Sequence, residues 1–354
     1  MGWPDTRLID LFGVALPIVQ APMANSSDID MAVAVAEAGG LGSFPCAGLS
    51  DDKVREGFAA IRSRTTKPIN LNFFCHDAPE QDLAREAAWL ERLAPYYQEL
   101  DVALPKPPLK GAIFRFTEAT CAVVEELRPE VVSFHFGLPA SGLVARVKQA
   151  GCKVISTATT RREALFLAER GVDAIIAQGA EAGGHRGMFL ETDVATQIGT
   201  FALVQLIVEV VKLPVIAAGG IGDERGIAAS FALGASGVQI GTAYLGCPEA
   251  TVSVLHRQAL GEPGRETVIA DVLSGRPARG ILNRFIREQG PINPEHPAYP
   301  LATPALAPLR SKAEAQGSGD FSWFWSGQGA PSAMGIGADA LTRKLADEAL
   351  ALLG

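Results

Sequence analysis

Short apolar runs bounded by Gly, Pro or Asn alternate with amphipathic stretches along most of the chain. Eight of these runs predict strands, at residues 17–23, 41–46, 69–74, 131–136, 152–157, 173–178, 214–218 and 237–242. Five of the seven intervals between their starts span 21 to 28 residues, enough for a strand, a three-turn helix and two short loops. Because the runs are apolar on both faces, they favour parallel strands covered by helices.

Helix start and stop signals support this alternation. Thr160-Arg-Arg-Glu163 is a capping-box sequence, and Gly171 closes the helix that it opens. Asp223 and Gly234 delimit another helix in the same way. Eight such units predict an α/β fold, a (β/α)₈ TIM barrel of about 250 residues. The alternative is an open doubly wound sheet, but no Gly-x-Gly-x-x-Gly follows the first predicted strand.

Two long intervals indicate where additional structure lies. The 62-residue interval after the third predicted strand contains helical patterns at 81–100 and 117–127, and the C-terminal region contains two more at 249–260 and 338–353. We expect a barrel built from 1–75 and 130–246. We expect the insertion 76–129 to pack with 247–354 as a smaller, mainly helical substrate or lid domain.

Composition and charge narrow the class of partner. Hydrophobic residues make up 48% of the chain and charged residues 20%, as in globular proteins. The net charge is −8 without a basic cluster, so a nucleic-acid or anionic-membrane partner is not expected. The N-terminus lacks the apolar core of a signal peptide, and the most apolar stretch carries charges and a proline. Five widely spaced cysteines suit reduced thiols in a cytoplasmic protein.

The predicted strand ends carry glycines and neutral side chains. Gly219 and Gly220 end the seventh strand, and Gln239-Ile-Gly-Thr242 ends the eighth. Two glycine-rich ends, each before a helix start, predict a phosphate cradle, although the glycines would also suit tight turns alone. No Lys lies at the carboxyl end of a predicted strand, so Schiff-base chemistry is not expected. We also expect no metal site. With Asn72 and Gln178, these ends suit an uncharged ring with a phosphate tail, such as FMN.

The loop Gln178-Gly-Ala-Glu-Ala-Gly-Gly-His-Arg-Gly187 follows the sixth predicted strand. Its glycines allow close approach of the backbone to a ligand. His185 is the one side chain in it that exchanges a proton near neutral pH without a large pKa shift. The alternative is a flexible surface loop with an incidental histidine. Glu181 and His185 are four residues apart, but the glycines between them disfavour a helical metal site.

Six motifs in order resemble the nitronate monooxygenases, formerly called 2-nitropropane dioxygenases. The resemblance covers roughly residues 8 to 246, and Leu273-Ser-Gly-Arg-Pro-Ala-Arg-Gly280 is similar to the class I branch. The motifs are the 178–187 loop and Pro17-Ile-Val-Gln-Ala-Pro-Met-Ala24, Gly39-Gly-Leu-Gly-Ser43, Asn70-Leu-Asn-Phe73, Pro214-Val-Ile-Ala-Ala-Gly-Gly-Ile221 and Gly237-Val-Gln-Ile-Gly-Thr242.

This resemblance implies an FMN-dependent enzyme that needs no metal. It makes His185 the catalytic base and His135 a second active-site histidine that binds substrate. His76, His256 and His296 match no family position, so surface or structural roles are expected for them. Arg186 is either an attractor for an anion or an exposed rim residue. The expected FMN-binding positions are Gly219, from the predicted phosphate cradle, and those that the resemblance implies: Pro22, Met23, Asn72, Gln178, Gly183, Gly220, Gln239, Ile240, Gly241 and Thr242.

The resemblance also implies the reaction, oxidation of an alkyl nitronate or nitroalkane by O₂ to a carbonyl compound and nitrite. The expected partners are a small anionic substrate and O₂, with the chain a monomer or homodimer. Tyr299 and the aromatic segment 323–328 are either a lid over the flavin or simple packing. The alternative function is an NAD(P)H-dependent FMN reductase, acting on a quinone or an enoyl-acyl-carrier-protein.

Overall fold

The computed structural model describes residues 2–111, 115–329 and 334–354. Its main sheet is parallel, with the strand order β1-β9-β8-β6-β5-β4-β3-β2. A parallel bridge between Val19 and Leu41 joins the two outer strands, so the sheet closes on itself. The (β/α)₈ barrel is therefore confirmed over the open sheet. All eight predicted strands are present: β1 (Ile18–Gln20), β2 (Gly42–Pro45), β3 (Ile69–Phe74), β4 (Val131–His135), β5 (Lys153–Ala158), β6 (Ala174–Gln178), β8 (Val215–Ala218) and β9 (Gly237–Ile240).

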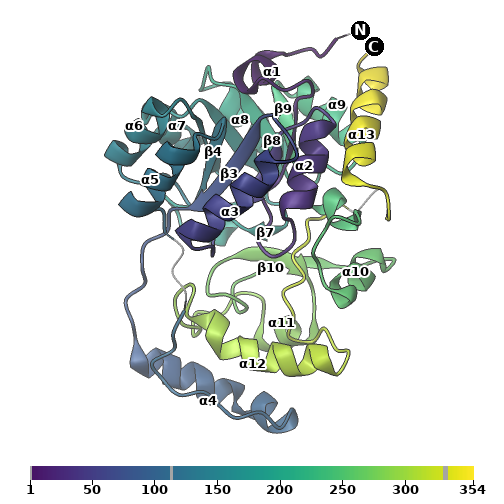
Figure 1. Cartoon of the computed structure of the whole chain (residues 1–354). Helices are drawn as coiled ribbons and strands as arrows, with labels where there is room; N and C mark the ends of the chain where they lie inside the picture. The colour runs from purple at the N-terminus through teal and green to yellow at the C-terminus, as the bar shows by residue number, and fades with distance from the viewer. Residues whose placement is uncertain (1, 112–114, 330–333) are drawn as a thin grey trace.

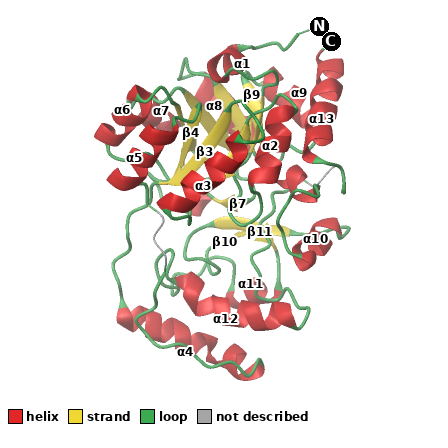
Figure 2. Ribbon diagram, in the orientation of Figure 1, coloured by secondary structure: helices red, strands yellow, loops and turns green. Residues whose placement is uncertain are grey.

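Helices surround this barrel in the upper half of Figures 1 and 2. The predicted caps are present: the Thr160 hydroxyl accepts from the backbone N–H of Glu163, and the Asp223 carboxylate accepts from that of Gly226. The short helix α1 (Arg7–Phe12) precedes β1. The surrounding helices are α2 (Ile29–Glu37), α3 (Asp51–Arg62), α5 (Glu118–Leu127), α6 (Ser141–Gln149), α7 (Arg161–Glu169), α8 (Thr200–Val208), α9 (Glu224–Ala232) and α13 (Ala338–Leu353).

The barrel interior is filled by apolar side chains from several of its strands. Val19, Leu41, Ile155 and Ile216 are buried there with Leu8 of α1. The layered apolar interior leaves the carboxyl ends of the strands as the place where polar groups can be presented, as in other barrels of this architecture.

A second apolar core lies below the barrel, in the lower half of Figure 1. Trp89 and Leu93 of α4 (Leu83–Glu99) pack there with Phe285 and Leu309, which belong to α11 (Arg284–Gln289) and α12 (Ala302–Ala315). This part also contains α10 (Val254–Gly261) and an antiparallel sheet in the order β10-β11-β7. The remaining elements are β10 (Thr267–Ala270), β11 (Ala278–Ile281), β7 (Gly184–His185) and the 3₁₀ turns η1 (Val194–Thr196) and η2 (Thr242–Gly246).

The last helix returns to the barrel. It packs against α2 and α9, while α5 packs against α3 and α6. The expected division into a barrel (1–75 and 130–246) and a smaller domain (76–129 and 247–354) stays a prediction, and these contacts favour a smaller second unit. Residues 112–114 and 330–333 of the expected smaller domain lie outside the described residues.

Candidate active site

The glycine loop after β6 leads into a strand of only two residues. Gly184 and His185 form β7, which pairs antiparallel with β11, so that His185 lies opposite Ala278 and Gly184 opposite Arg279. Gly184 has a φ of 73°, a left-handed conformation that favours glycine. The loop is therefore held by a sheet from the C-terminal region, and the alternative of a flexible surface loop does not describe it.

One nitrogen of the His185 ring is held by Ser274. The Nε2 atom lies 2.9 Å from the Ser274 hydroxyl oxygen, and that hydroxyl donates to the carbonyl of Arg276 at 3.2 Å. Because the single hydroxyl proton is used on the carbonyl, the oxygen is left to accept from an Nε2–H. The His185 Nδ1 then carries the lone pair, and it has no hydrogen-bond partner among the described residues.

The His185 ring is enclosed by aromatic side chains. The rings of Tyr299 and Trp325 each lie 5.3 Å from it, centroid to centroid. Burial, followed by the nearby His135, Arg276 and His76, lowers the pKa of His185 to about 3. The imidazole is therefore neutral at physiological pH and able to accept a proton at Nδ1.

His135 supports the backbone beneath this ring. Its Nε2 donates to the carbonyl of His185 at 3.1 Å, which leaves Nδ1 to accept from the Thr157 hydroxyl at 3.1 Å. Both ring nitrogens are thus used inside the protein, and burial lowers the pKa of His135 to about 3. This arrangement favours a positioning role, and substrate contact by His135 stays a prediction.

Gln178 and Arg186 fix the two ends of the loop. The Gln178 amide donates to the carbonyl of His185 and accepts from the N–H of Gly187. Arg186 is fully buried, and its guanidinium donates to the carbonyls of Gln178 and Gly179 and to the Gln197 side chain. Arg186 is therefore not an exposed rim residue, and those contacts hold its guanidinium inside the loop.

The end of β8 has the form of an anion cradle. Gly219 and Gly220 have φ values of 115° and 72°, and the backbone N–H groups of Gly220, Ile221 and Gly222 have no acceptor within the described ranges. A β-carbon at Gly219 would lie 2.9 Å from the backbone nitrogen of Ala182. Consecutive free N–H groups at a helix N-terminus bind anions readily.

A C-terminal strap, residues 325–328, crosses the glycine loop. A β-carbon at Gly183 would lie 2.5 Å from the backbone nitrogen of Gly327, so the two backbones touch directly. The N–H of Gly327 donates to the Thr242 hydroxyl at 2.9 Å, and the N–H of Gln328 donates to the carbonyl of Glu181. The strap therefore joins the sixth and eighth strand ends of the barrel.

The remaining expected cofactor positions also lie at strand ends. Pro22 and Met23 follow β1, and the Met23 sulfur approaches Gly241 after β9. Asn72 of β3 donates to the Ser133 hydroxyl and carbonyl. Gln239 precedes Ile240 at the end of β9, and its side-chain oxygen is buried without a hydrogen-bond partner among the described residues. An orphaned buried acceptor at a strand end is what a ligand N–H would satisfy.

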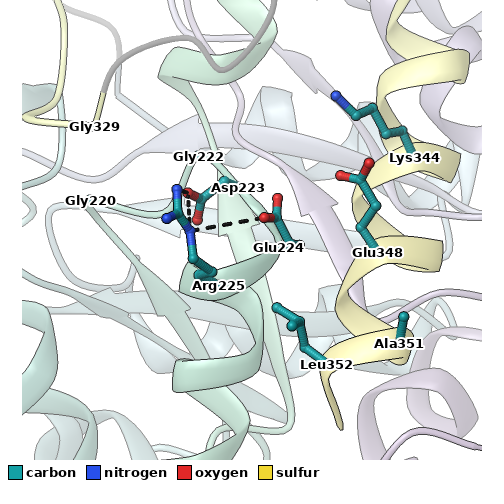
Figure 3. Close-up of a pocket in the computed structure, with 10 residues that line it drawn as sticks. All are labelled: Gly220, Gly222, Asp223, Glu224, Arg225, Gly329, Lys344, Glu348, Ala351 and Leu352. Atoms are coloured by element: carbon teal, nitrogen blue, oxygen red, sulfur yellow. Dashed lines mark hydrogen bonds and ion pairs between the residues drawn. The ribbon is translucent and has the colours of Figure 1, made fainter. Parts of the chain in front are cut away.

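An open surface cavity of about 750 Å³ adjoins the β8 cradle between α9 and α13. Figure 3 shows Arg225 paired with Asp223 and Glu224 on one wall and Lys344 and Glu348 on the other. Side chains of both charge signs therefore line it. Its lining residues are Gly220, Gly222, Asp223, Glu224, Arg225, Gly329, Lys344, Glu348, Ala351 and Leu352.

Of the three histidines without a family match, one lies beside the site. His256 stacks on Phe324 and contacts the carbonyl of Trp325, and His296 pairs with Asp271. His76, however, is buried 4.9 Å from the Tyr299 ring. His76 follows the end of β3 by two residues, and this position in the sequence is the signal that points to a place near the site.

Three further findings concern metal sites, cysteines and membrane-spanning helices. Within the described part of the chain, no group of three or more His, Cys, Asp or Glu side chains is arranged to hold a metal ion. The five cysteines are all free. None of the described helices combines the length and apolar character needed to cross a bilayer.

A closed (β/α)₈ barrel with a glycine-rich anion cradle and an enclosed, neutral imidazole is typical of an enzyme whose site lies at the strand ends. Comparison with known proteins narrows this class to one family. The family model for nitronate monooxygenase matches residues 5–347, and the chain belongs to that family of oxidoreductases, which are in general flavin-dependent.

Several relatives support the assignment. A nitronate monooxygenase of Pseudomonas aeruginosa is 43% identical over 97% of this chain and 98% of its own length. One from Paraburkholderia phytofirmans is 42% identical over 96% of this chain and 94% of its own. The nitroalkane oxidase of Streptomyces ansochromogenes has a similar solved structure (TM-score 0.87, 37% identity, 98% of each chain). FabK from Thermotoga maritima is more distant (TM-score 0.74, 27% identity, 98% of this chain and 96% of that one).

Proposed function

We propose that this enzyme oxidises alkyl nitronates, such as propionate 3-nitronate, or nitroalkanes with O₂ on a bound FMN, giving a carbonyl compound and nitrite. The observation that carries the proposal is the enclosed His185 ring, with one nitrogen held by Ser274 and the other free, beside a glycine-rich cradle. Family membership and the likeness to a nitroalkane oxidase support the same reaction.

The residues present fit FMN. The free N–H groups after β8 suit its phosphate, and the orphaned Gln239 oxygen suits an N–H on the ring. Bound FMN would supply the electron-transfer chemistry with O₂. The groups that would hold it are the predicted ones: the backbone at Pro22, Met23, Gly183, Gly219, Gly220, Ile240 and Gly241, and the side chains of Asn72, Gln178, Gln239 and Thr242.

His185 would perform the proton step. A neutral nitroalkane gives its α-proton to Nδ1, and the imidazolium so formed pairs with the nitronate anion through a charge-assisted hydrogen bond. Tyr299 and Trp325 cover the ring and limit the access of water to it. A preformed nitronate needs no proton removal, so it depends less on this base.

That difference gives the test. In the variant His185→Asn, we expect turnover of nitroethane to fall by about 10²- to 10⁴-fold, the range for loss of a general base. Turnover of ethyl nitronate should fall much less, while the visible spectrum shows that FMN stays bound. Equal losses on both substrates would mean that proton abstraction is not the role of His185.

The alternative, an NAD(P)H-dependent FMN reductase, has a different signature. The purified protein is mixed anaerobically with NADH or NADPH, and the flavin absorbance is followed. Rapid bleaching favours the reductase, whereas O₂ uptake with a nitronate and no nicotinamide favours the proposed oxidation. A colourless protein without flavin bands would contradict both. A cytoplasmic location and a monomeric or homodimeric state remain predictions.

A further inference from the structure

His76 is buried without a polar partner. It is 5% exposed, and neither of its ring nitrogens has a hydrogen-bond partner among the described residues. The four other histidines each have at least one such partner: His135, His185, His256 and His296. Leaving a buried donor and acceptor unsatisfied costs free energy, so a native group in this state needs a reason.

The position of His76 supplies a reason, because it shares its aromatic neighbours with His185. Its ring lies 4.9 Å from that of Tyr299 and 5.8 Å from that of Phe136. The same two rings lie 5.3 Å and 6.0 Å from His185. The two imidazoles therefore line one enclosure.

Arg276 brings an unmatched positive charge to the same enclosure. Its guanidinium lies 3.9 Å from the centre of the Phe136 ring, and its charge acts on His76 and Tyr299. Its one hydrogen bond among the described residues goes to the carbonyl of Met188. No ion pair joins it to a described carboxylate, although the charge of Glu163 acts on it. The buried Arg186, by contrast, donates to three acceptors.

We infer that His76, Arg276 and Tyr299 form an oxyanion pocket, which holds a planar two-oxygen anionic group of the substrate beside His185. Such a group is a nitronate or a carboxylate, and both present paired oxygens to N–H and O–H donors. The guanidinium supplies charge, and the imidazole and phenol supply directed hydrogen bonds. This inference rests on the proposed function for its substrate, but it gives His76 and Arg276 a role that the family resemblance does not.

Two variants at one position separate hydrogen bonding from packing. His76→Phe keeps a ring and removes both nitrogens, and His76→Gln keeps a donor. His76→Phe should raise KM about tenfold or more for propionate 3-nitronate, for ethyl nitronate, or for both of these substrates. This is the size expected for a lost hydrogen bond to a charged group. The kcat should change little, and His76→Gln should recover part of the loss. The Tm of His76→Phe should not fall, because the unpaired polar atoms are gone.

The substrates then identify which anionic group is held. If the pocket takes the nitronate, KM rises for both nitronates, and competitive inhibition by propionate is unaffected. If it takes the carboxylate, KM rises for propionate 3-nitronate alone, and propionate inhibits less. The KM of neutral nitroethane should stay the same in both cases. Unchanged KM values for both nitronates, or an equal rise for nitroethane, would overturn the pocket.

Binding of inorganic nitrate to the holoenzyme tests the pocket without turnover. Calorimetry should give a measurable affinity for the wild type. In His76→Phe and Arg276→Gln the affinity should be lower by about tenfold or more. A wild type that binds no nitrate, or an affinity that neither variant changes, refutes the inference. If nitrate binding behaves as expected but no nitronate is oxidised, the proposed function fails and the pocket stands.

Discussion

Ser274→Ala removes the side-chain hydrogen bond that His185 makes among the described residues. The contact is a neutral N–H···O bond of 2.9 Å in a buried place, and such a bond contributes about 1 kcal/mol. Without the acceptor, the proton can move to Nδ1, and part of the enzyme then presents an N–H where the base is needed. We expect kcat/KM for nitroethane to fall by roughly five- to tenfold, with little change for ethyl nitronate.

The assay is initial O₂ uptake with the two substrates over pH 6 to 9. Spectra of protein labelled with ¹⁵N-histidine report directly which nitrogen of His185 carries the proton. The wild type should show a neutral ring protonated at Nε2, and Ser274→Ala a mixture of both tautomers. Unchanged kcat/KM, or a wild-type ring protonated at Nδ1, would refute the assignment of Nδ1 as the base.

Two further predictions concern stability and the strap. Burial lowers the pKa values of four histidines to about 3 or 4, from 6.5 in the unfolded chain: His76, His135, His185 and His256. The unfolded chain then binds more protons below about pH 6.5, and each histidine lowers the free energy of unfolding by about 1 kcal/mol between pH 6.5 and 5.5. Urea titrations should show a drop of about 4 kcal/mol in that interval, and a flat profile would contradict it. Gly183→Ala places a methyl group against Gly327 and should lower stability by about 1 to 3 kcal/mol and release FMN more readily. Gly142→Ala, where a β-carbon meets nothing within 4 Å, is the control for thermal melting and flavin fluorescence.

The barrel was predictable because its signals are local and repeated. Each buried strand is a short apolar run, and caps such as Thr160 and Asp223 mark the helices between runs. The 81–100 pattern likewise predicted α4 from the spacing of its apolar positions. The pairing of β7 with β11 could not be predicted in this way, because two residues show no periodicity and their partner lies far along the chain.

The surroundings of individual side chains are harder to predict from the sequence than the helices and strands. Arginine is usually found at the surface, yet Arg186 is completely buried. The fold supplies three hydrogen-bond acceptors for its guanidinium. For His76 the sequence predicts a surface or structural role, because the residue matches no motif. Its place just after β3 is a signal of the same kind as the place of Asn72 within β3, because side chains at the carboxyl ends of barrel strands face the site.

The two apolar cores contribute different parts of the candidate site. The cradle after β8 belongs to the barrel, and its N–H groups are fixed by strand and helix ends. Ser274, Tyr299 and Trp325 come from the C-terminal region and set the tautomer and enclosure of His185. A change in that region can therefore alter proton transfer and access to the ring while the cradle keeps its geometry. Substitution of Ser274 should slow the turnover of neutral nitroalkanes, and substitution of Tyr299 should raise KM for nitronates. Neither change should weaken cofactor binding, because the cradle and the groups around His185 belong to separately packed parts of the chain.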